Sequence, residues 1–398
     1  MEDMTITASG CDFGSVHAAM RRFVERNILA GVSHAVLRGR DLVDVNCCGW
    51  ADREQDIALR VDHLFRVFSN TKLVTSCAAL LLHEQGRFNL DDPIERYIPR
   101  LANRRVLRPD ATALDHTEPA HSPITIRHLM SHSAGLSYGF LDPGSIIGKA
   151  YNDRNIQDPA VPLSGMIDTL AELPLVFHPG TSWEYSVATD VLARLIEIVS
   201  GQRFDAFIKA RILDPLGMVD TAFVVPEPER HRLTAYYRGA DPVDPMKPGL
   251  TRIDEEPYPG AYLTAVPRLS GGGGLVSSLP DMVALLRSLL PGGPTLLKAE
   301  TIALMMANQL PSGVTIRFPG IGAVPSKAYG LAGAVTLAPS SLDPQGSAGE
   351  LQWGGVAGTH WWISPKANLA CVVMTQREMA FWHPFAFELR QLVYQALG

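Results

Sequence analysis

The sequence predicts an α/β domain assembled from both ends of the chain, with a mainly helical domain inserted between them. Extended segments lie near the N-terminus and again after residue 257, whereas helical signals dominate the middle of the chain. The chain has 398 residues, which is longer than a single compact core usually runs. We therefore expect an α/β domain from residues 1–68 and 258–398, a mainly helical domain from 69–257, and an active site in the cleft between them.

The N-terminal segments indicate a helix followed by a β-hairpin. Residues 16–29 carry apolar side chains at helical spacing. Two extended segments, 33–37 and 42–47, follow and are joined through a short link that contains Gly39, a pattern typical of a hairpin. A further extended segment, 64–67, leads into the next helix.

Proline and glycine residues separate the elements expected in the rest of the chain. In the middle, helices are expected at residues 125–132, 163–173, 188–200 and 203–213. After residue 257, four glycines at 271–274 precede a helix at 280–290, strands at 329–337, 350–353, 360–363 and 369–375, and a final helix at 385–397.

The composition argues against several classes of function. The net charge is -6 and the cations are scattered, so neither nucleic acid nor an anionic membrane is an expected partner. No apolar run reaches membrane-spanning length, and residues 1–13 lack the cationic start and apolar core of a signal peptide. The five cysteines are odd in number and show no C-x-x-C spacing. We therefore expect reduced thiols and a cytoplasmic protein.

The stretch that bears most directly on chemistry is Ser69-Asn70-Thr71-Lys72, at the start of an apolar segment that predicts a helix. Positions i and i+3 share a helix face, so the hydroxyl and the amine can meet without help from the tertiary fold. A serine hydroxyl is a poor nucleophile until an adjacent base takes its proton. The N-terminus of a helix adds partial positive charge and free backbone N–H groups. The pattern predicts an acyl-transfer enzyme that needs no catalytic histidine.

A second informative stretch, residues 179–188, places Tyr185 in a turn just before a helix. A side chain at such a junction can be presented to a cleft. A tyrosine beside a lysine ammonium loses its proton more readily, and the phenolate can then act as a base or proton relay. The alternative is a core tyrosine at a loop–helix junction.

A third stretch, residues 351–362, contains Trp353-Gly354-Gly355-Val356 in an extended segment. Glycine within a strand often marks a bulge or a close backbone approach. A strand lining an acyl site needs such an approach, because its N–H groups must reach the substrate carbonyl. A hairpin turn at Ala357-Gly358 between packed tryptophans is the simpler interpretation, and the two are compatible.

Three other patterns are interpreted as structural. Gly135-Leu136-Ser137-Tyr138-Gly139 matches the G-x-S-x-G nucleophile elbow, but a helical segment rather than a strand precedes it. His128 and His132 have a zinc-compatible spacing, yet H-E-x-x-H is incomplete, so helix capping or core hydrogen bonding is the expected role. The glycine run 271–274 lacks the residues of a phosphate loop and indicates a tight turn or close packing.

Taken together, Ser69-x-x-Lys72, Tyr185-Ser186-Val187 and Trp353-Gly354-Gly355 resemble motifs of the serine β-lactamase and penicillin-binding-protein superfamily. The closest similarity is to its class C-like esterase branch, the family VIII carboxylesterases. The resemblance covers nearly the whole chain, through the segments 90–94, 125–136, 214–218 and 272–278. It implies a serine β-lactamase-like fold, in which an antiparallel sheet is flanked by helices and carries an inserted helical domain.

The resemblance also implies roles for individual residues. Ser69 would be the acylated nucleophile, and Lys72 its base partner. Tyr185 would shuttle the proton to the leaving alcohol and later activate water. The backbone N–H groups of Ser69 and Val356 would form the oxyanion hole, and Trp353, Gly354 and Gly355 would line the substrate site. Whether Lys72 or Tyr185 is the base in acylation stays open, because the two groups titrate as a pair.

Two departures from the β-lactamase pattern change the class of substrate that we expect. Val187 stands where β-lactamases and penicillin-binding proteins carry asparagine, and Trp353 stands where they carry lysine, which can hold a substrate carboxylate. We therefore expect a serine carboxylesterase that acts without a cofactor or metal on short-chain or small uncharged esters. An acyltransferase, an amide or β-lactam hydrolase, and a non-catalytic penicillin-recognition module are the alternatives.

Overall fold

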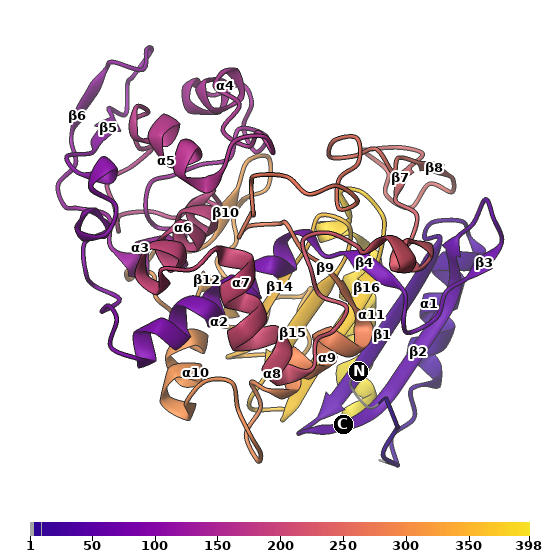
Figure 1. The fold of residues 1–398 in the computed structure, drawn as a ribbon. Coiled ribbons are helices and arrows are strands. Elements are labelled where there is room, and N and C mark those ends of the chain that lie inside the picture. Colours follow the sequence, from indigo (N-terminus) through magenta and orange to yellow (C-terminus); the bar gives the residue numbers. More distant parts are fainter. Residues whose placement is uncertain (1–3, 9) are drawn as a thin grey trace.

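An eight-stranded antiparallel sheet is built from both ends of the chain (Figure 1). The computed structural model describes residues 4–8 and 10–398; residues 1–3 and 9 of the predicted 1–68 segment lie outside the described part. The strand order is β12-β13-β14-β15-β16-β1-β2-β3, so the two ends meet where β16 pairs with β1. Its strands are β1 (Gly31–Arg38), β2 (Asp41–Asp52), β3 (Ile57–Ala58), β12 (Lys327–Tyr329), β13 (Ala334–Thr336), β14 (Leu351–Gly354), β15 (His360–Ser364) and β16 (Leu369–Thr375).

Helices cover both faces of this sheet. On one face, α1 (Gly14–Glu25) and α11 (Pro384–Leu397) pack against a cluster that includes Val32 and Val36. On the other face, α9 (Leu279–Arg287) packs against β16 and β1, in the core that contains Ala35 and Leu37. Side chains alternate between the two faces of a strand, and because both faces of β1 are covered, all but its last residue are buried.

Eight further α-helices lie in the part of the chain that the structure describes. They are α2 (Thr71–Glu84), α3 (Ile126–Met130), α4 (Ile146–Asp153), α5 (Leu163–Ala171), α6 (Ala188–Ser200), α7 (Phe204–Ile208), α8 (Asp214–Leu216) and α10 (Ala299–Met306). At the centre, α2 packs against α6, and every side chain of α2 up to Leu82 is buried. A helix that is enclosed on all sides holds its side chains rigidly. The site residue Lys72 lies on this helix.

Four short strand pairs complete the fold: β4 (Leu64–Arg66) with β9 (Val276–Ser278), β5 (Arg105–Leu107) with β6 (Thr117–Pro119), β7 (Tyr237–Gly239) with β8 (Leu250–Arg252), and β10 (Arg317–Phe318) with β11 (Gly322–Ala323). The β4–β9 pair positions the site. It continues into hydrogen bonds from Val67 N–H to the Leu275 carbonyl (3.1 Å) and from Leu275 N–H to Thr71 Oγ1 (3.1 Å). These contacts fix the glycine run beside the start of α2.

The structure confirms the predicted fold class and several individual elements. The hairpin near the N-terminus is present as β1 and β2. The helix expected at 188–200 is α6, which ends at Ser200 and is capped by Gly201 with a φ of 71°. Glycine is favoured at that position because it adopts the left-handed conformation without steric cost. The domain boundaries at residues 68 and 257 stay a prediction.

Other elements differ from the prediction for identifiable reasons. The single strand expected at 329–337 is the hairpin β12–β13, because Gly330 and Gly333 allow the backbone to turn against Met305 and Gln352. The helix expected at 16–29 ends at Glu25, and the apolar residues after it pack in the following turn. The helix expected at 203–213 is α7 followed by a π-helical turn.

Among the residues that the structure describes, no helix is both long enough and apolar enough to cross a membrane. Of the cysteines, Cys77 and Cys371 are buried and the other three are half-buried.

A buried ion network ties the edge of the sheet to α11. Lys327 Nζ of β12 lies 2.6 Å from Asp343 Oδ1, and Arg390 Nη1 of α11 lies 2.9 Å from the same oxygen. Burial raises the pKa of Asp343, but the Lys327 ammonium and the hydrogen bonds from Ser340 and Arg390 outweigh it and hold the pKa well below its usual range. This carboxylate stabilises the fold only while it is ionised.

Replacing Asp343 with alanine leaves two buried cations without their shared partner. We expect Asp343→Ala to lower the free energy of unfolding by about 3–5 kcal/mol at pH 7, measured by chemical denaturation. The folded-state pKa is depressed, so the contribution is present above the unfolded-state pKa and is lost as pH falls through the folded-state value. The control Asp168→Ala, which breaks an exposed pair with Arg100, costs at most about 1 kcal/mol. Equal costs for the two variants would contradict the assignment.

Candidate active site

Ser69 lies in the 3₁₀ turn Phe68–Asn70 that leads directly into α2. The sequence predicted that Ser69 opens the helix; α2 itself begins two residues later, at Thr71. Phe68 has a φ of 42°, a conformation that residues other than glycine rarely adopt. Such strained residues are found most often at functional sites. The strained residue therefore directly precedes the predicted nucleophile.

Two predicted site residues contact the Ser69 hydroxyl. The Tyr185 hydroxyl donates a hydrogen bond to Ser69 Oγ at 2.7 Å, and the Lys72 ammonium donates to the same oxygen at 3.4 Å. Lys72 is only 2% exposed, and its Nζ lies 4.6 Å from the centroid of the Tyr185 ring. Both groups that could accept the serine proton are thus within reach of it.

The Lys72 ammonium has two further oxygen partners that sequence reasoning missed. It donates to the Gly272 carbonyl at 2.7 Å and to the Tyr138 hydroxyl at 3.2 Å. Burial, together with nearby Tyr185 and Asp190, raises the pKa of Tyr138 well above its usual value, so this hydroxyl keeps its proton. Tyr138 directly follows Ser137 of the rejected G-x-S-x-G pattern, which is the one sequence signal that led toward it.

Asp190 holds the glycine run against Lys72. Its Oδ1 accepts hydrogen bonds from Ser270 Oγ (2.7 Å) and from Gly272 N–H (3.4 Å). A Cβ atom at Gly272 would lie 2.8 Å from Asp190 Oδ2, 2.9 Å from the Tyr138 hydroxyl and 3.3 Å from Lys72 Nζ. Only glycine fits there, which gives the predicted close packing of residues 271–274 a specific cause.

Trp353 donates a hydrogen bond from its indole Nε1 to the Tyr185 hydroxyl at 3.3 Å. Ser186, the residue after Tyr185, donates a hydrogen bond from its backbone N–H to His132 Nδ1 at 3.2 Å, and this contact fixes the turn before α6. Burial and the Lys72 ammonium hold the pKa of His132 well below its usual range, so its imidazole is neutral. His132 therefore supports the tyrosine, in agreement with the structural role predicted for it.

The turn after β14 approaches the nucleophile closely. A Cβ atom at Gly355 would lie 2.5 Å from the Val67 carbonyl oxygen and 2.4 Å from Thr359 Oγ1. Glycine at this position lets the turn pack directly against the backbone preceding Ser69. Val356, the residue that follows, lines the same cleft as Ser69.

The two remaining patterns of the sequence lie outside the reacting groups. Ser137 is 2% exposed, and its Oγ donates to the Tyr138 carbonyl at 3.5 Å rather than facing the cleft. His128 forms a capping box with Thr125 at the start of α3, as predicted: Thr125 N–H donates to His128 Nδ1 and His128 N–H donates to Thr125 Oγ1. Neither group of neighbouring metal-ligating side chains in the described part of the chain includes a residue of the cleft.

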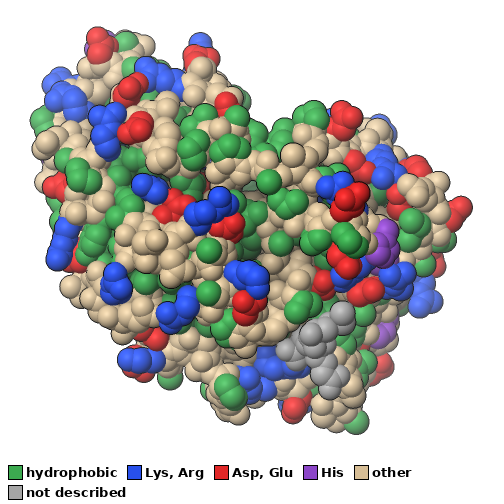
Figure 2. Space-filling view, viewed as in Figure 1, with side chains coloured by type: hydrophobic (Ala, Val, Ile, Leu, Met, Phe, Trp, Pro, Cys, Tyr) green, Lys and Arg blue, Asp and Glu red, His purple; other side chains and the backbone are tan. Residues whose placement is uncertain are grey.

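Ser69 opens onto a cleft of about 1450 Å³. Figure 2 shows the surface hollowed between the part that carries α4 and the part that carries β7 and β8, with hydrophobic side chains along the rim. The lining is mainly apolar and includes twelve aromatic side chains: Phe68, Tyr138, Phe140, Tyr185, Phe223, Tyr236, Tyr258, Tyr262, Phe318, Trp353, Phe381 and Trp382. Such a wall favours apolar substrates.

The sequence matches the model of the Beta-lactamase family over residues 16–393. The chain belongs to this family. Esterase EstB from Burkholderia gladioli is 30% identical over 401 residues, which cover 98% of this chain and 97% of that protein. Lovastatin esterase from Penicillium rubens is 33% identical over 338 residues, or 79% of each protein. The solved structure of EstCE1, a hydrolase with promiscuous acyltransferase activity, matches with a TM-score of 0.82 at 25% identity, and the match covers 96% of this chain and 98% of that one. The predicted similarity to the esterase branch is thereby confirmed.

Removing the Tyr138 hydroxyl tests whether it holds Lys72 in place. We expect Tyr138→Phe to lower kcat for a p-nitrophenyl ester by about 10- to 100-fold, the rate equivalent of one hydrogen bond to a charged group. KM should change little, because the ring remains. The control Phe140→Leu changes a neighbouring cleft side chain that lacks a polar contact to Lys72. A Tyr138→Phe variant with wild-type kcat would contradict the role.

Proposed function

We propose that this protein is a serine carboxylesterase that works through an acyl-enzyme on Ser69. The observation that carries the proposal is the convergence of Tyr185 (2.7 Å) and Lys72 (3.4 Å) on one serine hydroxyl at the floor of an apolar cleft. A hydroxyl with two candidate proton acceptors, on a turn held beside a helix N-terminus, is equipped for nucleophilic attack. The similarity to Esterase EstB over nearly the whole chain supports the same reaction class.

In the proposed acylation step, the reactive form of the Lys72–Tyr185 pair has lost one proton and holds either a neutral amine or a phenolate. Ser69 Oγ attacks the ester carbonyl carbon while its proton passes to that deprotonated group. The carbonyl oxygen becomes an oxyanion, which accepts hydrogen bonds from the backbone N–H groups of Ser69 and Val356. When the tetrahedral intermediate collapses, the C–O bond to the leaving alcohol breaks and Tyr185 returns the proton to that oxygen. Water then enters, loses a proton to the same pair and attacks the acyl carbon. The bond from that carbon to Ser69 Oγ breaks, the pair returns the proton to Oγ, and the acid leaves.

Trp353 has a role in this proposal beyond lining the substrate site. Its indole N–H points at the Tyr185 hydroxyl oxygen. When Tyr185 serves as a base it does so as the phenolate, whose negative charge lies on this oxygen, and a donor at that atom stabilises the charged form. The same side chain stands where β-lactamases and penicillin-binding proteins carry a lysine that can hold a substrate carboxylate. We therefore propose uncharged esters as the substrates, with poor turnover of β-lactams.

The size of the cleft favours a second activity on the same acyl-enzyme. Small-molecule sites usually measure about 300–1,000 Å³, and this cleft, at about 1450 Å³, exceeds what a short-chain ester fills. The surplus space can hold a bulky alcohol. We propose short acyl groups on larger apolar alcohols, with acyl transfer to an added alcohol competing with hydrolysis, an activity named for the structural neighbour EstCE1.

The two activities are separated by product partition. Wild-type protein should release p-nitrophenol from a short-chain p-nitrophenyl ester, and an added apolar alcohol should divert the acyl group from free acid to a new ester. Ser69→Ala should lower kcat/KM by at least about 10⁴-fold for both products while circular dichroism stays unchanged. Activity retained in Ser69→Ala would overturn the esterase proposal. Free acid as the sole product at saturating alcohol would overturn acyl transfer alone.

The pH–rate profile of a Trp353 variant tests the role of its indole N–H. Trp353→Phe keeps an aromatic wall and removes the N–H, so we expect kcat to fall several-fold to about 10-fold and the acidic limb of the pH–rate profile to move to higher pH. The matched control is Trp382→Phe, since Trp382 lines the cleft but contacts Phe318 and Phe381 rather than Tyr185. A profile that shifts equally in both variants would show that Trp353 acts only through packing.

A further inference from the structure

We propose that His17, His34 and Asp44 form a binding site for a divalent transition-metal cation, with Zn²⁺ as the best fit. The three residues come from α1, β1 and β2 respectively. They lie on the sheet face that α1 covers, whereas α2 and Ser69 belong to the opposite side of the sheet. The site is thus independent of ester hydrolysis.

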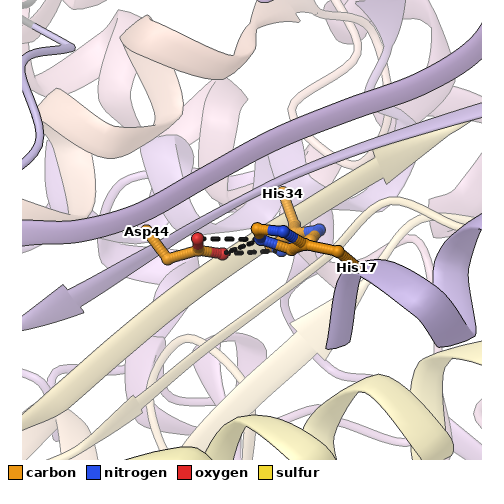
Figure 3. A group of neighbouring side chains, drawn as sticks. All are labelled: His17, His34 and Asp44. Atoms are coloured by element: carbon orange, nitrogen blue, oxygen red, sulfur yellow. Dashed lines mark hydrogen bonds and ion pairs between the residues drawn. The ribbon is translucent and has the colours of Figure 1, made fainter. Parts of the chain in front are cut away.

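The three ligand atoms already converge. His17 Nε2 lies 2.9 Å from Asp44 Oδ1, and His34 Nε2 lies 2.9 Å from Asp44 Oδ2. All three ligand atoms lie within 4.8 Å of one another. Figure 3 shows both imidazole rings directed at the same carboxylate, one from the helix and one from the neighbouring strand. Ligands of a tetrahedral zinc ion, each about 2.0–2.2 Å from the metal, need only small outward shifts from these positions.

The chemistry of the donor set selects the kind of ion. Two imidazole nitrogens and one carboxylate oxygen suit Zn²⁺ and similar transition metals, whereas Ca²⁺ and Mg²⁺ prefer oxygen ligands. Three protein ligands leave a fourth position for water. The His17 side chain is 33% exposed and Asp44 only 7%, so a cation can enter from the His17 side and keep a water there.

The surroundings of His34 limit the affinity. This side chain is fully buried, and its Nδ1 has no hydrogen-bond partner in the part of the chain that the structure describes. Metal binding at Nε2 places the ring hydrogen on Nδ1, where second-shell acceptors normally stabilise it. We therefore expect reversible binding, weaker than that of a closed structural zinc site, and a metal that reinforces the packing of α1 on the β1–β2 hairpin.

A second cluster, Glu118, His121 and His178, is the natural comparison. Both ring nitrogens of His178 are already engaged, since Nε2 lies 3.0 Å from Glu118 Oε1 and Nδ1 accepts a hydrogen bond from His121 N–H at 3.3 Å. His121 is exposed. The first cluster is better enclosed and has both imidazole Nε2 atoms directed at one point, so we assign the site there.

The test uses the full-length protein after treatment with a chelator, titrated with ZnCl₂ by isothermal calorimetry and followed by Tm. Wild type should bind one Zn²⁺ and gain thermal stability. His17→Gln, on the partly exposed helix face, should weaken binding by at least about 100-fold and abolish the Tm gain. The matched control His121→Gln should bind as wild type does, and ester hydrolysis should be equal in all three proteins.

Three outcomes would overturn the proposal. They are absence of Zn²⁺ binding by the wild-type protein, unchanged binding by His17→Gln, and loss of binding by His121→Gln with retention by His17→Gln. Circular dichroism of the metal-free variants checks that His17→Gln is folded. In a folded variant, the loss of Zn²⁺ binding reports on the ligand rather than on the fold.

Discussion

The arrangement around Ser69 depends on one constraint: the Lys72 ammonium is buried and must be matched by oxygen atoms. A buried cation is costly unless it is hydrogen-bonded. The Gly272 carbonyl at 2.7 Å and the Tyr138 hydroxyl at 3.2 Å supply this match from segments about 200 and 66 residues away. The β4–β9 pair and the hydrogen bond from Gly272 N–H to Asp190 hold the glycine run beside Lys72. With Lys72 fixed, Ser69 one turn earlier is fixed as well.

The surroundings of Tyr185 bear on its role as a proton relay. Three residues contact this one side chain. Its hydroxyl hydrogen-bonds Ser69, the Lys72 ammonium lies over its ring, and the Trp353 indole N–H donates a hydrogen bond to its oxygen. The position where β-lactamases and penicillin-binding proteins carry a lysine therefore supplies a neutral donor that is directed at the tyrosine. In our proposal, Trp353 does not bind a charged substrate group. It supports proton transfer by Tyr185 instead. The apolar cleft around it fits the same shift toward uncharged esters.

The sequence predicted the parts of the site that are local or patterned. Ser69 and Lys72 are neighbours on one helical face, so their meeting needed no tertiary information. Tyr185 and the stretch that contains Trp353 were singled out from local patterns, and the resemblance then assigned their roles. The end of α6 was predicted from Gly201. Tyr138 and Gly272 were missed because their contacts with Lys72 arise only when distant segments pack together. The β12–β13 hairpin was read as one strand because its turn residues, Gly330 to Gly333, are apolar or small and carry no polar turn signal.

The most direct measurement of the central claim is mass spectrometry of the protein quenched during turnover of a slowly deacylated ester. The account predicts a single acyl adduct on the peptide that contains Ser69, formed at the rate of the p-nitrophenol burst and absent from Ser69→Ala. An adduct on Ser137 or on another residue, or turnover without any covalent adduct in the burst, would contradict it.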